Sequence, residues 1–390
     1  MARHPTGWHF LQLPGPTNVP RRVLQAIAEP TIDHRGPEFP RLTKEVLDGL
    51  AWVFRTEHPV VMYAASANGA WEATLVNTLS PGDRVLMFET GHFALEWAAM
   101  ARKLGLDVEL VPGDWRRGAR PEDVEERLRA DPQGRIRAVA VVHNETSTGA
   151  VTRIPEIRAA IDAVGHPALF FVDAVSSLAS IDLRHDEWGI DVTVAGSQKG
   201  LMLPPGLSFT AIGPRAREAA RSASLPRSYW DWERMLAANA QGYFPHTPAT
   251  NLLVGLRESL RMLREEGLEN VFRRHARYGI ATRRAVARWG LELQCNVPEE
   301  CSDVLTAVRV PEGHDADHVR QVILDRFSLT LGSGLGRLKK QVFRIGHLGD
   351  LNDLMLIAAL AGVESGLVAA GVPIDRGGVQ AAMESLEETA

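Results

Sequence analysis

Short apolar runs of strand length alternate with amphipathic stretches through the first 212 residues of this 390-residue chain. The runs carry few charges, which is typical of strands buried on both faces of a parallel sheet. The stretches between them have the apolar spacing of helices. This alternation predicts a doubly wound α/β fold with a mostly parallel central sheet. We expect strands at 60–65, 84–88, 138–143, 169–173, 192–196 and 207–212, and helices at 95–104, 121–130 and 154–164.

The pattern changes after residue 248, where leucines at helical spacing predict a helix that Gly267 ends. Further helices are expected at 271–289, 316–327 and 353–370, with strands at 305–310 and 342–345 and a flexible glycine-rich loop at 332–336. This order indicates a smaller α+β domain at the C-terminus. We therefore expect an N-terminal arm over 1–20, a large domain over 21–265 and a small domain over 266–390.

Composition gives no sign of a nucleic-acid or membrane partner. The net charge is −5, and no stretch approaches the roughly 20 apolar residues of a spanning helix. The start of the chain has no apolar signal core. Cys295 and Cys301 do not have the spacing of a metal site or a disulfide framework, and the histidines form no metal motif. We expect no metal, and a reducing cytoplasm is the simplest compartment.

Lys199 lies among small, polar and apolar residues directly after the strand expected at 192–196. The chain has five lysines among 43 basic residues, so arginine is its ordinary surface cation. An amine that loses its proton and attacks a carbonyl has to be lysine, because guanidinium cannot do this. Lys199 is therefore either a surface residue at a strand end or the Schiff-base lysine of a pyridoxal 5'-phosphate (PLP) enzyme.

Asp173 ends the apolar run 169–173, at the strand end where ligands bind in open α/β sheets. Alone, such an aspartate is often a helix N-cap or a metal ligand. PLP requires a carboxylate beside its pyridine nitrogen, because the protonated ring is the electron sink. Asp173 and Lys199 lie on successive predicted strands, and together they indicate a PLP site.

Other segments also carry side chains suited to a ligand. Small residues at 66–69 follow a strand and open a helix, which suits a phosphate group. The polar loop 143–149 is either a ligand-facing loop or a plain turn, and Phe93 either stacks on a flat ring or packs in the core. Arg344 lies inside an apolar strand and needs a partner, which is either a structural salt bridge or a substrate carboxylate.

Taken in order, these segments resemble the class V, fold-type I PLP aminotransferases, in particular the alanine/serine–glyoxylate aminotransferases. The resemblance runs nearly end to end, with its motifs at 14–20, 143–149, 172–177, 196–199, 204–206 and 344–346. The segments 31–35, 225–231 and 344–349 are similar to the bacterial serine–glyoxylate branch. The chain departs from the family at Ala67-Asn68, and at Phe244, which replaces a phosphate-binding tyrosine and lies beside Tyr243.

The resemblance implies a role for each candidate residue. Lys199 would hold the cofactor and move the proton, Asp173 would pair with the pyridine nitrogen, and Arg344 would bind the substrate α-carboxylate. The other implied cofactor contacts are Ser66, Ala67, Asn68 and Gln198 at the phosphate, Thr146 at the ring hydroxyl, Val175 and Phe93 at the ring faces, and Thr247 at the phosphate of the neighbouring subunit.

The implied activity is transamination of an amino acid with a 2-oxo acid by a homodimer. L-Serine would be the donor and glyoxylate the acceptor, with glycine and hydroxypyruvate as products. Aspartate–glyoxylate or alanine–glyoxylate transamination is the alternative. A nicotinamide dehydrogenase is disfavoured because the chain lacks an early glycine fingerprint. A cysteine desulfurase is disfavoured because both cysteines lie in the expected C-terminal domain.

Overall fold

Within residues 7–388, which the computed structural model describes, the larger sheet has seven strands. β10 is antiparallel to both of its neighbours, and the other strand pairs are parallel. The carboxyl ends of the six other strands therefore meet at one edge of the sheet, and the predicted mostly parallel sheet is confirmed. In spatial order the strands are β2 (Val60–Tyr63), β10 (Ser208–Ile212), β9 (Val192–Gly196), β8 (Leu169–Asp173), β5 (Ile136–Val142), β3 (Arg84–Phe88) and β4 (Asp107–Val111).

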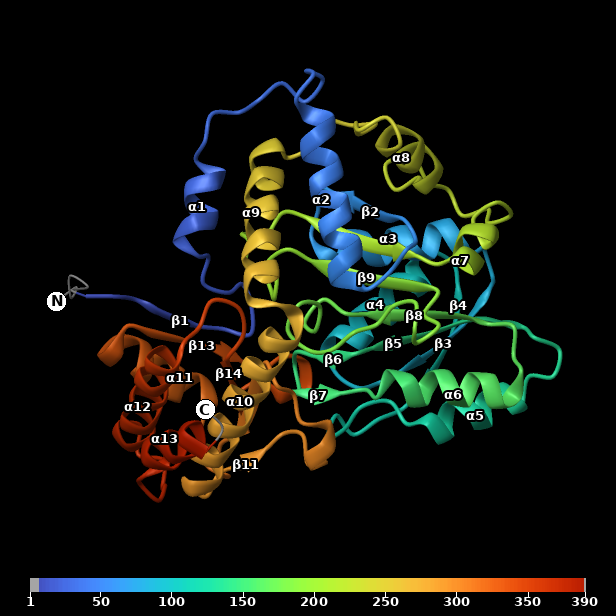
Figure 1. The fold of residues 1–390 in the computed structure, drawn as a ribbon. Helices are drawn as coiled ribbons and strands as arrows, with labels where there is room; N and C mark the ends of the chain where they lie inside the picture. The colour runs from blue at the N-terminus through green and yellow to red at the C-terminus, as the bar shows by residue number, and fades with distance from the viewer. Residues whose placement is uncertain (1–6, 389–390) are drawn as a thin grey trace.

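Side chains alternate between the two faces of this sheet, and helices cover both faces (Figure 1). On β8, Phe170 and Val172 enter one core, while Leu169 and Phe171 enter the other. Both cores are closed to water, which explains why this strand is apolar throughout. The first core is covered by α2 (Phe39–Phe54), α5 (Pro121–Arg129), α6 (Ile154–Val164) and α9 (Thr250–Glu266), and the second by α3 (Ala67–Thr78), α4 (His92–Lys103), α7 (Pro214–Ala219) and α8 (Trp232–Asn239).

A second sheet has five strands among the described residues. Four of them come from the C-terminal part of the chain, and the fifth, β1 (Phe10–Gln12), comes from near the N-terminus of the chain. β1 pairs in parallel with β13 (Leu329–Ser333), so a strand from the start of the chain lies beside the C-terminal helices and strands in Figure 1. The remaining strands, in order from β13, are β14 (Val342–Gly346), β12 (Leu305–Arg309) and β11 (Glu292–Leu293). A separate apolar core joins this sheet to α10 (Leu268–Arg288), α11 (Ala316–Phe327), α12 (Asp353–Ala369) and α13 (Gly378–Glu388).

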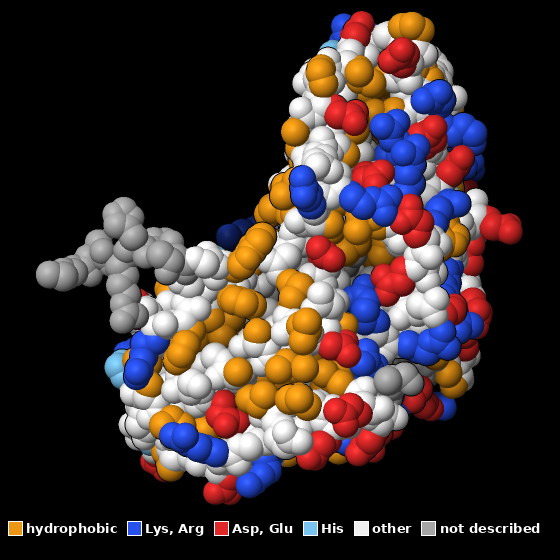
Figure 2. All heavy atoms as spheres, turned by 60° about the vertical axis from the view of Figure 1, so that its left-hand side comes forward, with side chains coloured by type: hydrophobic (Ala, Val, Ile, Leu, Met, Phe, Trp, Pro, Cys, Tyr) orange, Lys and Arg blue, Asp and Glu red, His pale blue; other side chains and the backbone are white. Residues whose placement is uncertain are grey.

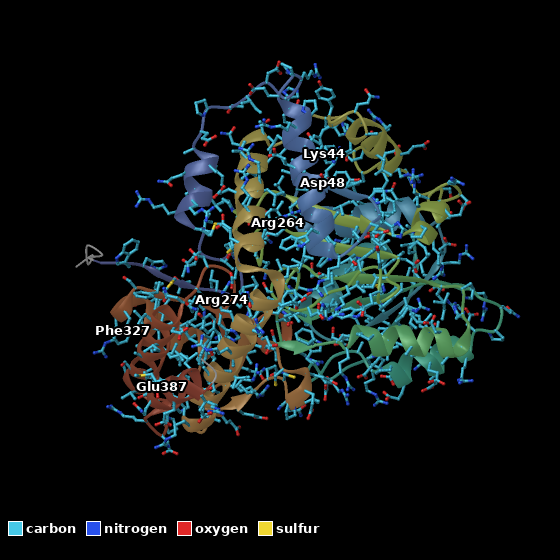
Figure 3. The ribbon with its side chains drawn as sticks, in the orientation of Figure 1. Lys44, Asp48, Arg264, Arg274, Phe327 and Glu387 are labelled. Atoms are coloured by element: carbon cyan, nitrogen blue, oxygen red, sulfur yellow. The ribbon has the colours of Figure 1, made fainter. Side chains whose placement is uncertain are left out.

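The chain passes from the first set of helices to the second at Gly267, between α9 and α10, where φ is +81°. On one side, the Arg264 guanidinium lies 5.0 Å from the centre of the Trp52 ring on α2. On the other, Arg274 bonds Glu266 at 2.6 Å and the Gly349 carbonyl at 3.0 Å. Figure 3 labels Arg264 and Arg274 on the two helices. These contacts hold the turn at Gly267 on both sides, next to the predicted domain border at 265/266. The predicted limits of the arm and of the two domains remain our proposal.

Several elements escaped the sequence analysis or differ from it. The stretch 332–336 is not one loop, because Gly332 and Ser333 end β13 and Gly336 begins the short helix η2 (Gly336–Leu338). Edge strand β4 was missed, since it carries Asp107 and Glu109 on a half-exposed surface. Other unpredicted elements are α1 (Arg21–Ile27), α2, α7, α8, α13, β1, β11, the hairpin β6 (Asn144–Glu145) and β7 (Ala150–Val151), and η1 (Pro298–Glu300). Among the described helices, none combines the length and apolarity needed to cross a bilayer.

The N-terminal arm lies directly against β14, and this close approach generates a prediction. A Cβ at Gly346 would overlap the backbone of Leu13 and Pro14, which cannot rotate away as a side chain can. We expect Gly346→Ala to destabilise the protein by about 1–3 kcal/mol, because the arm has to move. A thermal melt measures the change.

Gly362→Ala on α12 is the control, because its Cβ would closely approach only the movable end of the Leu329 side chain, at 2.9 Å, with Phe327 Cβ at an ordinary contact distance of 3.9 Å. Alanine also favours the helical state. An unchanged or raised melting temperature is expected for this variant. Equal melting temperatures for both variants would contradict a tightly seated arm.

Candidate active site

The predicted site residues come together at the sheet edge where the parallel strands end. Ser66 follows β2, Phe93 follows β3 and Thr146 follows β5. Asp173 is the last residue of β8, and Lys199 lies three residues beyond β9. Because neighbouring parallel strands end at one edge, residues more than 100 positions apart in sequence face one space.

That space is a cavity of ≈ 230 Å³. Seven residues to which the sequence analysis gave no cofactor role also line it: Gly15 and Pro16 of the N-terminal arm, Trp71, Val142, Asn144, Ser176 and Pro205. The predicted residues that line the cavity are Ser66, Ala67, Asn68, Phe93, Thr146, Asp173, Val175, Gln198 and Lys199. The structure thus brings together nine of the eleven predicted residues, and Arg344 and Thr247 lie outside the lining.

Lys199 is a buried amine, 7% exposed, and its Nζ donates a hydrogen bond to the carbonyl oxygen of Pro14. Burial, followed by the nearby Arg344 guanidinium, lowers the pKa of Lys199 to about 7. An amine with this pKa is partly uncharged near neutral pH, which is the form that attacks a carbonyl. Lys199 is therefore no surface residue, and its surroundings prepare it for covalent chemistry.

Asp173 is a buried carboxyl group held on both of its oxygens. Oδ1 accepts a hydrogen bond from the backbone N–H of Val175 at 2.7 Å, and Oδ2 accepts one from Trp71 Nε1 at 3.1 Å. Burial raises the pKa of Asp173 to about 7, and the negative charge of Glu145 adds to this rise. A cationic ring nitrogen beside it would favour the ionised form, which is what a pyridine partner requires.

Arg344 is a buried guanidinium, 7% exposed, in the middle of β14. It donates from Nε to the Ser333 carbonyl and from Nη1 to the Thr146 carbonyl, both at 2.8 Å. Within residues 7–388 it forms no ion pair, so the structural salt bridge considered from the sequence is not found. Burial lowers the pKa of Arg344 to about 10. The charge of Glu145 acts on Arg344 without forming an ion pair, and a buried cation that lacks one favours an anionic ligand.

The opposite end of the cavity is the N-terminus of α3. Ser66 is the N-cap of this helix, and its side chain makes no capping bond, so the first N–H groups of α3 have no side-chain acceptor there. The Oε1 atom of Gln198 is buried beside them without a hydrogen-bond partner in the described chain. Gly196 makes room for this amide, because a Cβ there would lie 3.0 Å from Oε1. Free donors at a helix N-terminus favour a phosphate.

Two residues of the loop 143–149 belong to the site although the sequence analysis gave them no role. Glu145 is fully buried and accepts hydrogen bonds from Ala94 N at 3.1 Å and Ser147 Oγ at 2.7 Å, so it caps α4 and anchors the loop. Asn144 lines the cavity, and both polar atoms of its amide are buried without a partner among the described residues. The polar character of the loop was the available signal.

The N-terminal arm closes the site over Lys199. Gly15 has φ +110°, a conformation that other residues rarely adopt. A Cβ at Gly15 would also lie 2.8 Å from Lys199 Nζ. Both the backbone conformation and the close approach of Lys199 therefore require a glycine at this position. The motif beginning at Pro14 had been noted in the sequence, but its contact with the lysine could not be inferred from it.

Thr247 is exposed and lines a different pocket, together with Phe244 and Tyr229. Tyr243 and Phe244 both pack against Phe39, at ring-centre distances of 6.4 and 6.1 Å, and neither lines the cavity. A role for these residues in cofactor binding would require a second chain.

These features fit PLP. The cavity offers an amine at Lys199 for the aldehyde, an acid at Asp173 for the ring nitrogen and a helix N-terminus at Ser66 for the phosphate. The unpartnered amides of Asn144 and Gln198 supply donors and acceptors for the polar atoms of a ligand. The arrangement can bind an aldehyde cofactor and an acid substrate in one space.

Comparison with known proteins agrees with this geometry. The family model "Aminotransferase class-V" matches residues 9–334. A serine–glyoxylate aminotransferase of Methylorubrum extorquens is 49% identical over 98% of this chain and 97% of its own. An L-aspartate–glyoxylate aminotransferase of Paracoccus denitrificans is 44% identical over 97% of this chain and 96% of its own. The crystal structure of a pyridoxamine–pyruvate aminotransferase from Mesorhizobium loti has a TM-score of 0.92 at 28% identity and covers 100% of both chains.

The fold, the cavity and these matches confirm the family, the fold type and the cofactor that the sequence predicted. The chain belongs to the class-V aminotransferases, which use pyridoxal 5'-phosphate.

Proposed function

We propose that this aminotransferase transfers the amino group of L-serine to glyoxylate, giving hydroxypyruvate and glycine. The observation that carries the proposal is a cavity lined by Lys199 and Asp173, with the buried Arg344 outside the lining but bonded to the carbonyl of the lining residue Thr146. Arg344 forms no ion pair within residues 7–388, which suits an amino acid with a single carboxylate. The 49% identity to a serine–glyoxylate aminotransferase supports the choice of substrates. The pyruvate acceptor named for the Mesorhizobium loti protein makes pyruvate the natural competitor in an assay.

Lys199 is the residue that we propose to hold the cofactor and to move the proton. When bound, PLP supplies the carbonyl that takes up the amino group and the conjugated ring that spreads the electron pair left by proton removal. Lys199 Nζ can release and accept a proton near neutral pH, since its pKa is lowered to about 7. Pro14 and Gly15 cover the amine and limit the access of water.

Asp173 and Arg344 are the proposed charge partners of cofactor and substrate. Asp173 would stabilise a protonated ring nitrogen with whichever oxygen lone pair remains beside its bonds to Val175 and Trp71. Arg344 would bind the α-carboxylate of donor and acceptor, because two of its nitrogens are already fixed by backbone carbonyls and the group is held in one orientation. Ser66, Ala67, Asn68 and Gln198 would hold the phosphate, and Thr146, Val175 and Phe93 the ring.

The main alternative is an aspartate donor, and the 44% identity to an aspartate–glyoxylate enzyme supports it. Aspartate carries a second carboxylate that needs a second cation. Of the described residues lining the cavity, none is an arginine or a histidine, and Lys199 is reserved for the cofactor. The neutral polar groups of Asn144, Thr146 and Ser176 suit a hydroxyl instead. This favours serine over aspartate.

The test is the rate of glycine formation by the purified enzyme with glyoxylate and, in turn, L-serine, L-aspartate and L-alanine. We expect the highest kcat/KM for serine, and a lower value when pyruvate replaces glyoxylate. A value for aspartate tenfold above that for serine would overturn the proposed donor.

We also propose a homodimer in which Thr247 of one chain reaches the cofactor phosphate of the other. Thr247 is exposed and outside its own cavity. Figure 2 shows hydrophobic side chains gathered along a hollowed face. In the N-terminal segment, Trp8 before β1 and Leu24 on α1 are 88% and 50% exposed. Such a surface favours association. Sedimentation at assay concentration that finds an active monomer would exclude the dimer.

A cytoplasmic location completes the proposal. Both cysteines are free thiols in the structure, which suits a reducing compartment. Fractionation of cells that produce the protein checks the location, and activity confined to an oxidising compartment would contradict it.

Arg344→Lys is expected to lower kcat/KM by an amount corresponding to roughly 2–5 kcal/mol, because lysine keeps the charge but loses the two-pronged geometry. The loss should appear for serine and glyoxylate alike, since both present a carboxylate. Steady-state kinetics with each substrate, alongside a melting curve, measure it.

Arg309→Lys is the matched control, because Arg309 ends the neighbouring strand β12 and bonds Gln294 at 2.6 Å. Its kinetics should stay unchanged. A large fall in the melting temperature of Arg344→Lys with unchanged Michaelis constants would assign Arg344 a structural role.

Lys199→Met is expected to abolish transamination and to stabilise the cofactor-free protein. The pKa of Lys199 is lowered on folding, so its burial destabilises the fold fully below about pH 7 and not at all above pH 10.5. Replacing the amine therefore gains stability as the pH falls through this window, by at most about 5 kcal/mol. Melting curves of both cofactor-free proteins at several pH values measure the difference. A stability gain that is the same at pH 10.5 and pH 7 would contradict the buried, uncharged amine.

A further inference from the structure

Trp71 is a cavity residue that neither the sequence analysis nor the proposed chemistry uses. It lies on α3, is 2% exposed and lines the cavity. Its indole Nε1–H donates to Asp173 Oδ2 over 3.1 Å, although the two residues are 102 positions apart. Apart from the N-cap Ser66, the α3 residues given roles so far, Ala67 and Asn68, belong to its first turn. Through Trp71, α3 also contacts Asp173, the proposed partner of the ring nitrogen.

The contact with Trp71 differs in kind from the other bond to Asp173. Oδ1 is held by the backbone N–H of Val175, two residues further along the same chain segment. That local bond fixes the position of Oδ1 alone, so the carboxylate plane could still rotate and move Oδ2. In the described chain, Trp71 is the one side chain that donates to Asp173, and it fixes the second oxygen. Two bonds to different oxygens set the plane of the carboxylate.

Trp71 is itself rigidly held. Its ring stacks on that of Trp97 on α4, with centroids 5.8 Å apart and planes at 15°. Both rings belong to the apolar core on that face of the sheet, and Trp97 is fully buried. The Nε1 of Trp97 is buried without a hydrogen-bond partner among residues 7–388. Two similar indoles therefore share one stack, and one of them contacts Asp173.

We propose that Trp71 is a positioning residue for Asp173: its indole N–H holds Oδ2 so that the carboxylate presents a fixed oxygen to the ring nitrogen of PLP. The inference rests on the proposed role of Asp173 as the ring partner. Trp71 does not take part in bond making, and it acts through Asp173.

The same bond bears on the proton of Asp173. The charged groups that face this carboxyl are Glu145 on β6 and Lys199 after β9. Burial and Glu145 raise the pKa of Asp173, whereas the bonds from Val175 and Trp71 and the charge of Lys199 lower it. Without the indole donor the pKa rises further, and Asp173 keeps its proton over a wider range of pH. A protonated acid cannot balance the charge of a pyridinium ring.

The experiment compares Trp71→Phe with Trp97→Phe in the full-length protein. Each variant removes one indole from the same stack, but only Trp71→Phe removes a donor to Asp173. Cofactor-free protein is titrated with PLP at pH values from 6 to 9, and melting curves are recorded for both variants. We expect Trp71→Phe to weaken PLP binding about fivefold at pH 7 and about ninefold at pH 6, corresponding to a rise of about one unit in the pKa of Asp173. The difference should shrink towards pH 9, where Asp173 is ionised in both proteins. Trp97→Phe should bind PLP like the wild type at every pH, even if it melts lower.

Asp173→Asn separates this inference from the proposed function. In that background Trp71→Phe should have no further effect on the dissociation constant, because the two residues act as one unit. Equal pH curves for Trp71→Phe and Trp97→Phe, or an undiminished effect of Trp71→Phe in Asp173→Asn, would overturn the positioning role alone. If Asp173→Asn itself left PLP affinity and its pH dependence unchanged, both the ring-partner assignment and the role of Trp71 would fall.

Discussion

Lys199 and Asp173 are both withdrawn from water, and burial moves their pKa values towards each other, to about 7 in each case. In water a lysine and an aspartate differ by roughly six units. Burial removes most of this difference, so near neutral pH the amine and the acid have similar affinities for a proton, and each is partly protonated. Glu145 and Arg344, also buried, act on this pair with opposite signs. The sheet edge, the helix N-termini and the arm all serve to keep these four groups dry and in place.

The site depends on contact between two sheets that have separate cores. The larger sheet supplies Lys199 and Asp173, while β14 of the smaller sheet supplies Arg344. The arm lies between them, and glycine at 332 admits it, because a Cβ there would lie 3.0 Å from Pro14 and 3.1 Å from Arg344. Arg344 in turn bonds the carbonyl of Thr146 in the larger sheet's loop. A substrate carboxylate would thus bind where the two sheets are tied together.

The strands could be predicted because a strand buried on both faces is an apolar run, as in 169–173. Asp173 and Lys199 could be predicted as site residues because they lie at or just after the ends of such runs. Arg344 could be found because a cation in an apolar strand is conspicuous. Trp71 and Glu145 could not be assigned, since a tryptophan in a helix reads as core and an acid in a polar loop reads as solvated. Their roles arise from contacts across long stretches of chain, with Asp173 and with α4. Edge strand β4 was missed because its partial exposure allows charges that hide the pattern.

The pairing of β1 with β13 has a consequence for how the protein is made. Phe10 leaves the ribosome early, and its partner Leu329 emerges only when most of the polypeptide has been synthesised. Contacts this distant in sequence slow folding, because a long loop has to close before they form. The larger sheet can assemble during translation from strands that follow one another closely, such as β8 and β9. The N-terminal arm is made first but can be seated over Lys199 only after β13 and the Arg344 strand β14 have been made, so a nascent or truncated chain carries a finished larger sheet with an open, unfinished catalytic centre.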